Sequence, residues 1–169
     1  MISTVVFDLD DTLYDEIDYC RSGFSAVSEY LSKLHGAFST EQIFNSIWMQ
    51  FTASDRTKVF NQALDDLKIP YDPVLIHDLV RIYREHLPNI TLPADSKEVL
   101  EILCGKYALA LLTDGFLPAQ RLKVEALKLE KFFKCIIYTE ELGRQYWKPS
   151  QAGFEKIQKI LKQKPENTV

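Results

Sequence analysis

The stretch TVVFDLDDTLYDE, residues 4–16, carries the strongest pattern in this sequence. Its first four residues, TVVF, predict the end of a buried strand, because apolar and β-branched side chains favour that position. Asp8, Asp10 and Asp11 follow directly. Like charges so close together repel one another, and the end of a buried strand is an unfavourable place to collect them. The pattern therefore raises the question of what offsets this negative charge.

Length and composition bound the class of protein. A chain of 169 residues can form one core, or a core with a small inserted domain. The net charge is −4 and the chain has no basic stripe, which argues against a nucleic-acid partner. No apolar run is long enough to cross a membrane, and the N-terminus lacks the pattern of a signal peptide. Cys20, Cys104 and Cys135 lie far apart, which favours free thiols in a reducing cytoplasm over a disulfide framework or a zinc site.

Residues 15–87 show the periodicity of helices. Apolar residues recur at steps of three and four in four successive blocks, and the pair Asp72-Pro73 predicts the start of the fourth helix. Four amphipathic helices of this kind can pack as a small bundle. The sequence therefore predicts a helical domain here.

After residue 88, predicted strands alternate with predicted helices. The apolar runs at residues 107–112 and 135–138 predict strands, and Asp95 is expected to cap the first of the helices. The helices are expected at residues 95–105, 118–127 and 150–163. This alternation predicts an α/β fold with a parallel sheet and helices on its faces. The core domain would be discontinuous, formed by residues 1–14 and 88–169, with residues 15–87 as an insertion.

Each predicted strand leads into a polar residue. Asp8 follows the first strand, Thr113 follows the second, and a loop carrying Lys148 follows the third. In parallel α/β sheets, ligands bind beyond the carboxyl ends of the strands. If the three strands are neighbours, a carboxylate, a hydroxyl and an ammonium group converge at one edge of the sheet.

This set of groups suits phosphoryl transfer. The Asp8 carboxylate can attack phosphorus, and Asp10 can protonate the departing alkoxide and later take a proton from water. The hydroxyl and the ammonium group can hold the phosphoryl oxygens, where negative charge spreads in the transition state. A magnesium ion would reduce the repulsion between carboxylate and phosphate. Metal and phosphate are therefore the expected partners of the crowded carboxylates.

The segments VVFDLDDTL, LLTDG and WKP resemble the first three motifs of the haloacid dehalogenase-like (HAD) hydrolase superfamily, in its phosphatase branch. Their order and spacing match, with a helical cap between the first motif and the others. The resemblance covers essentially the whole chain. It implies a Rossmann-like parallel sheet with helices on both faces, an inserted four-helix cap, and a magnesium-dependent phosphatase that acts on a small soluble metabolite.

The first motif carries the family's central roles. By resemblance, Asp8 is the nucleophile and a magnesium ligand. Asp10 is the general acid and base, and its backbone carbonyl is a second magnesium ligand. Thr12 supports the turn after the nucleophile. The acid at Asp10 also distinguishes this chain from the true dehalogenases, which lack it, because a leaving alkoxide needs a proton and a halide does not.

The other two motifs carry substrate-binding roles. By resemblance, the Thr113 hydroxyl binds phosphate with help from the backbone N–H of Asp114. Lys148 matches the cation that steadies both the nucleophile and the phosphoryl group.

The sequence departs from the family's pattern at its end. The family has a fourth, acidic motif at the end of the next strand, which completes the magnesium site. Here the sequence ends in KQKPENTV, and Val169 is expected to be the first residue of that strand, beside the first one. We therefore expect a core that lacks its C-terminal part, weakened metal binding, and an exposed apolar edge along residues 4–7 that allows self-association.

Simpler interpretations stay open for single residues. The acidic cluster can be a solvated turn or a generic divalent-ion loop, and for Asp11 alone a turn or helix-start role is favoured. Thr113 can be a turn hydroxyl that bonds its own backbone, and Lys148 can be an ordinary surface lysine. For the whole chain, the alternatives to a phosphatase are a non-catalytic fragment or interaction protein, and a phosphomutase.

Overall fold

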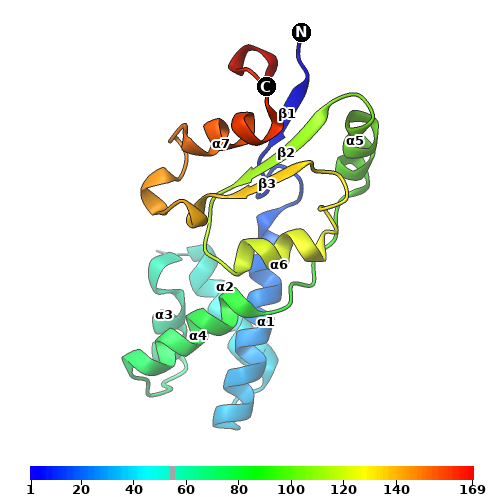
Figure 1. Ribbon diagram of the computed structural model, residues 1–169. Coiled ribbons are helices and arrows are strands. Elements are labelled where there is room, and N and C mark those ends of the chain that lie inside the picture. The colour runs from blue at the N-terminus through cyan, green and yellow to red at the C-terminus, as the bar shows by residue number, and fades with distance from the viewer. Residues whose placement is uncertain (54–55) are drawn as a thin grey trace. The chain divides into compact units, whose positions relative to one another are not determined.

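The computed structural model in Figure 1 describes residues 1–53 and 56–169. Contacts within the chain divide it into two compact units. We call Met1–Glu16 together with Asn89–Val169 the α/β unit, and Ile17–Pro88 the helical unit. The use of the helical unit as a cap over a site stays a prediction.

The α/β unit contains a parallel sheet, as the sequence predicts. Its strands are β1 (Thr4–Phe7), β2 (Ala108–Thr113) and β3 (Cys135–Tyr138), and they lie side by side in the order β1-β2-β3 (Figure 1). Phe7 lies opposite Leu111, and Thr113 lies opposite Tyr138. The carboxyl ends of the three strands therefore meet at one edge of the sheet, where the polar residues follow.

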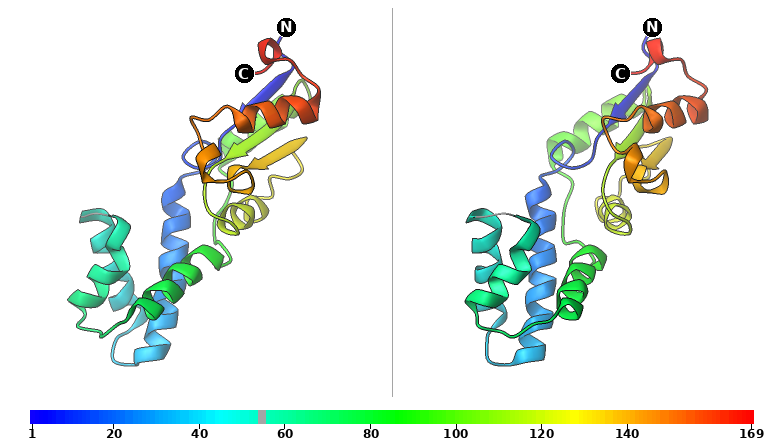
Figure 2. Two further views of the ribbon diagram at one scale, coloured as in Figure 1. Left: turned by 60° about the vertical axis from the view of Figure 1, so that its left-hand side comes forward. Right: turned by 90° about the vertical axis from the view of Figure 1, so that its left-hand side faces the viewer.

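Helices cover both faces of this sheet (Figure 2). Helix α7 (Ala152–Leu161) lies on one face, and α5 (Ala94–Cys104) and α6 (Ala119–Ala126) lie on the other. The strands bury both faces, which explains why β2 is apolar without interruption up to Thr113. On the α7 face, apolar residues of β2 and β3 pack against Ile157, which is fully buried.

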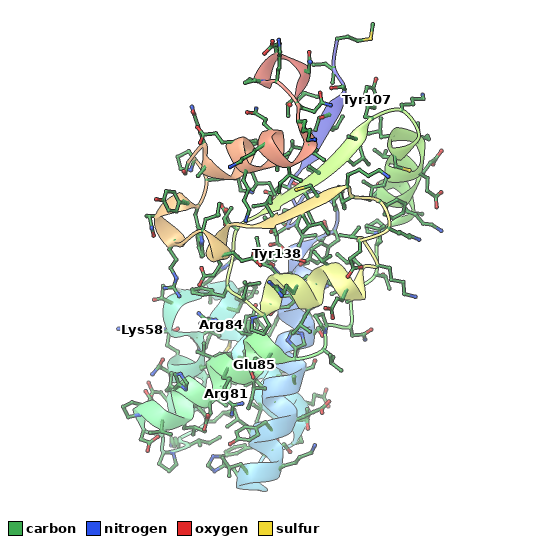
Figure 3. All side chains as sticks on the ribbon, in the orientation of Figure 1. Lys58, Arg81, Arg84, Glu85, Tyr107 and Tyr138 are labelled. Carbon is green, nitrogen blue, oxygen red and sulfur yellow. The ribbon has the colours of Figure 1, made fainter. Side chains whose placement is uncertain are left out.

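Tyr138, labelled in Figure 3, is the last residue of β3, and its side chain lies beside α6. The guanidinium carbon of Arg121 lies 5.4 Å from the centre of the Tyr138 ring. Burial raises the pKa of Tyr138 to about 12, so its phenol stays neutral in the physiological range.

The last residues of the chain lie beside β1. Thr168 pairs in parallel with Thr4, the Val6 N–H donates to the Val169 carbonyl at 2.7 Å, and the Val169 N–H donates to the Thr4 carbonyl at 3.1 Å. The expected position of Val169 is therefore confirmed. The expectation of an open edge along residues 4–7 is wrong for the part from Thr4 to Val6, because these backbone groups have partners.

The described residues of the helical unit form four α-helices, as their periodicity predicts. They are α1 (Glu16–His35), which begins at the last residue of the first α/β segment, α2 (Thr40–Ala53), α3 (Val59–Asp66) and α4 (Pro73–Glu85). All four contribute to one apolar core that includes Phe24, Ile47, Leu64 and Leu79. Asp72 caps α4 by accepting from the Leu75 N–H at 2.8 Å. None of the described helices has the length and apolar character needed to cross a membrane.

Candidate active site

The candidate site is built on the segments that leave the carboxyl ends of β1, β2 and β3. Asp8 is the first residue after β1, and Thr113 is the last residue of β2. Thr139 is the first residue after β3, and the following loop carries Lys148. The parallel register therefore brings together groups that lie more than a hundred residues apart in the sequence.

Asp8 and Lys148 form an ion pair. The Lys148 ammonium lies 2.7 Å from Asp8 Oδ1, and the Leu9 N–H donates to the same oxygen at 2.8 Å. Asp8 Oδ2 makes no hydrogen bond within the part of the chain that the structure describes, and the Asp8 side chain is 45% exposed. One carboxylate oxygen is thus fixed, and the other is open to a ligand.

Asp10 is held far more tightly than Asp8. Its Oδ1 accepts from the Tyr14 hydroxyl at 2.7 Å and from the Lys123 ammonium at 2.8 Å, and its Oδ2 accepts from the Gln120 amide at 2.8 Å. Lys123 also lies 3.2 Å from the Glu16 carboxylate. The sequence pattern did not predict Tyr14, Gln120 and Lys123 as parts of the site.

These contacts answer the question raised by the acidic cluster. Lys148 lies against Asp8, Lys123 lies against Asp10, and the Glu16 N–H donates to the Asp11 carboxylate at 2.9 Å. The chain itself therefore supplies partners that the sequence analysis assigned to metal and phosphate alone.

The residues after Asp10 form a turn. Asp11 has a left-handed backbone with φ of 52°, and its side chain accepts from the first residue of α1, which is the turn and helix-start role favoured for it. Thr12 is exposed, and its N–H lies 3.4 Å from the Leu9 carbonyl. Among the residues that the structure describes, the side chain of Thr12 makes no hydrogen bond to Asp8 or Asp10, so its supporting role stays a prediction.

Thr113 is only 1% exposed. Its Oγ1 accepts from the Gln120 amide at 2.9 Å, and its own proton has only a long contact of 3.4 Å to the Asp114 carbonyl. Because an amide N–H already occupies one lone pair, the hydroxyl proton is left to donate elsewhere. This arrangement is compatible with phosphate binding, which needs a donor.

Asp114 joins the ends of two strands to the Lys148 loop. Its Oδ1 accepts from the Thr139 hydroxyl at 2.6 Å, and its Oδ2 accepts from the Lys148 backbone N–H at 2.9 Å. The Lys148 ammonium in turn lies 3.4 Å from the Leu112 carbonyl. The Asp114 side chain therefore orders the loop that brings Lys148 to Asp8, a role that the sequence analysis did not assign to it.

The donors suitable for a magnesium ion are few. The described residues contain no group of three or more His, Cys, Asp or Glu side chains arranged to hold a metal. Asp8 Oδ2 is an open carboxylate oxygen, whereas the Asp10 carboxylate is occupied by three donors. Magnesium commonly takes one or two protein oxygens and completes its shell with water and substrate phosphate. The open Asp8 oxygen fits this sparse requirement, and the role of the Asp10 backbone carbonyl as a second ligand stays a prediction.

The fold and these groups define a known class of protein. The family model for haloacid dehalogenase-like hydrolases matches residues 2–169, and the chain belongs to this family. The resemblance inferred from the three motifs is therefore confirmed, and the chain is a hydrolase by resemblance.

The chain is also similar to particular curated phosphatases and to solved structures of the same fold. Over 174 residues the chain is 25% identical to the pyrophosphatase PpaX of Anoxybacillus flavithermus, covering 99% of this chain and 73% of that relative. Over 182 residues it is 27% identical to the N-acylneuraminate-9-phosphatase of Rattus norvegicus, again covering 99% and 73%. A solved HAD-superfamily hydrolase of subfamily IA, variant 1, from Geobacter sulfurreducens PCA has the same fold, with a TM-score of 0.66 at 17% identity, covering 99% of this chain and 76% of that one.

Proposed function

We propose that this chain hydrolyses small, soluble phosphate monoesters through a phosphoryl group held covalently on Asp8. The observation that carries the proposal is the Asp8 carboxylate, which has Lys148 at 2.7 Å from Oδ1 and an open Oδ2. The phosphatases among the curated relatives support the reaction class, though they act on different phosphorylated compounds.

The first step is attack by Asp8 Oδ2 on phosphorus. A bond forms between Oδ2 and phosphorus, and the ester P–O bond breaks with its electron pair going to the leaving oxygen. That oxygen takes the proton carried by Asp10. Lys148 and Thr113 hold the phosphoryl oxygens as charge spreads over them.

The second step returns Asp8 to its starting state. Water gives a proton to the Asp10 carboxylate and attacks phosphorus. The bond between phosphorus and Asp8 breaks, releasing inorganic phosphate. Asp10 therefore acts as an acid in the first step and as a base in the second, which returns it to its protonated form.

Magnesium belongs to this proposal as the cofactor. The Asp8 carboxylate and the Asp10 backbone carbonyl would hold it, and when bound it would reduce the repulsion between the nucleophile and the phosphate. With so few protein donors we expect weak binding, and therefore activity that rises with magnesium over the millimolar range. The separated free cysteines support a reducing compartment such as the cytoplasm. Self-association along residues 4–7 is not part of the proposal, because the last residues of the chain pair with Thr4 and Val6.

The test is hydrolysis of 4-nitrophenyl phosphate by the full 169-residue chain, with magnesium and with EDTA, beside an Asp8→Asn variant. We expect turnover that depends on magnesium and falls to background in the variant. Acid quenching followed by mass spectrometry should locate phosphate on the peptide that contains Asp8.

Three results would contradict the proposal. A folded wild-type chain without turnover would favour a non-catalytic interaction protein. Turnover that survives Asp8→Asn would place the nucleophile elsewhere. Transfer of the phosphoryl group to a second sugar hydroxyl in place of water would instead favour a phosphomutase.

A further inference from the structure

Helix α6 turns polar residues toward the protein interior. Gln120 and Lys123 lie three residues apart on one face of this helix, and they are 2% and 3% exposed. Lysine is almost never fully buried unless it is paired, because removing an ammonium group from water is unfavourable. A buried lysine at the edge of a candidate site therefore calls for a reason.

Both residues contact the same carboxyl group. The Lys123 ammonium donates to Asp10 Oδ1 at 2.8 Å, and the Gln120 amide donates to Asp10 Oδ2 at 2.8 Å. A third donor, the Tyr14 hydroxyl, reaches Oδ1 at 2.7 Å. The two carboxylate oxygens are thus fixed from three directions, which sets the rotation of the Asp10 side chain.

The three donors also make the two oxygens of Asp10 different. Each carboxylate oxygen can accept about two hydrogen bonds, one for each lone pair. Oδ1 accepts two, from Tyr14 and Lys123, whereas Oδ2 accepts only one, from Gln120. Oδ2 is therefore the oxygen with a lone pair left to carry a proton.

Gln120 links this acid to the phosphate-binding hydroxyl. The same amide nitrogen that contacts Asp10 lies 2.9 Å from Thr113 Oγ1. It also contacts the Asp114 backbone carbonyl. One side chain of α6 therefore sets the spacing between the proton donor and the end of β2.

We propose that Lys123, together with Gln120 and Tyr14, is a positioning residue that fixes the Asp10 carboxyl group so that Oδ2 delivers the proton to the leaving oxygen. The inference rests on the proposed function, since it concerns the acid of that reaction. The hydrogen bonds described for Lys123 go to the Asp10 and Glu16 carboxylates. Its effect acts through Asp10.

A role in proton delivery has a signature that a role in folding lacks. An acidic leaving group, such as 4-nitrophenolate, departs readily without a proton, whereas phenolate benefits more from one. Impaired positioning of the acid should therefore slow phenyl phosphate more than 4-nitrophenyl phosphate. A loss of folded protein would lower both rates by the same factor. The value of kcat/KM reports this first step, because the leaving group has departed before the second.

The experiment measures kcat/KM for both esters with wild type, Lys123→Met, Tyr14→Phe and the control Lys134→Met. General acid catalysis contributes roughly 10²–10⁴-fold, and Lys123 is one of three donors, so we expect Lys123→Met to slow phenyl phosphate about 10-fold or more. We expect about 3-fold or less for 4-nitrophenyl phosphate. Lys123→Arg, which keeps the charge and donors, should recover part of the loss. Lys134 is exposed, and its substitution should change neither ester.

Tyr14→Phe keeps the experiment decisive if Lys123→Met fails to fold, because it removes only one hydroxyl. It should shift the ratio of the two esters in the same direction by a smaller factor. Equal losses for both esters, or no loss for either, in the folded variants would overturn the inference while leaving the proposed function intact. A folded wild-type chain that hydrolyses neither ester would overturn the proposed function and this inference with it.

Discussion

The hydrogen bond between Thr139 and Asp114 ties the end of β3 to the end of β2. The Thr139 hydroxyl donates to Asp114 Oδ1 at 2.6 Å, and Thr139 is 1% exposed. The other Asp114 oxygen accepts from the Lys148 N–H at 2.9 Å. We predict that this carboxylate contributes to the stability of the α/β unit as well as to the placement of Lys148.

The size of the effect follows from the bonds that each variant loses. A hydrogen bond to a charged group contributes about 1.5–3 kcal/mol to stability. Thr139→Val should therefore lower the free energy of unfolding by about 2 kcal/mol. Asp114→Ala loses both bonds and should lower it by about 3–5 kcal/mol. The double variant should lose less than the sum, by about 1.5–3 kcal/mol, because the shared bond is lost only once.

The assay follows unfolding of the α/β unit alone. The sequence has two tryptophans, with Trp48 in the helical unit and Trp147 in the α/β unit. In a Trp48→Phe background, Trp147 fluorescence during urea unfolding reports on the α/β unit. A matched control is Thr91→Val, since Thr91 is exposed in the same unit. It should change the free energy of unfolding by less than about 0.5 kcal/mol.

The result that refutes this reasoning is additivity. If the two single losses sum to the loss of the double variant within about 0.5 kcal/mol, the bond between Thr139 and Asp114 contributes nothing measurable. A Thr139→Val variant as stable as its parent would lead to the same conclusion.

Two further predictions test packing and burial. A Cβ added at Gly153 of α7 would lie 2.5 Å from Leu112 Cδ1, so Gly153→Ala should lower the free energy of unfolding by about 1–2 kcal/mol in urea titrations. The control is Gly105→Ala, where an added Cβ would meet no atom closer than 3.9 Å and the free energy of unfolding should not fall. Equal stability of the two variants would contradict the packing of Gly153 against Leu112. Burial shields the Cys135 thiol from reagents and raises its pKa, whereas Cys104 is exposed. A thiol reagent should therefore label Cys104 first and Cys135 only in denaturant. Equal labelling rates in the folded chain would show that Cys135 is accessible.

The strands follow from the sequence almost residue by residue. β1 and β3 have the predicted bounds, and β2 begins and ends one residue later than predicted. Apolar runs bounded by polar residues carry enough information for this. The helix starts agree less closely with the prediction from the sequence. The predicted cap at Asp72 is confirmed, but the one at Asp95 is wrong, because α5 begins at Ala94 and the Asp95 carboxylate accepts from the adjacent Ser96 N–H.

The candidate site was predictable only where a motif marks it. Asp8 and Lys148 stand at strand ends, and the structure brings them into contact. Gln120 and Lys123 belong to types that are mostly found on surfaces, and nothing in the local pattern indicates that they are buried. Their positions follow from the packing of α6 against the sheet, which is a property of the tertiary structure.

The pairing of β1 has a consequence for the order of folding. Thr4 lies opposite Ala108 on one side and Thr168 on the other, whereas the core of the helical unit forms within residues 17–88. Contacts between distant residues form slowly, and domains with local contacts can fold during synthesis. We therefore expect the apolar segment TVVF to stay unpaired until the segments around Ala108 and Thr168 have left the ribosome. The hazard of aggregation at this strand then belongs to the nascent chain more than to the folded protein.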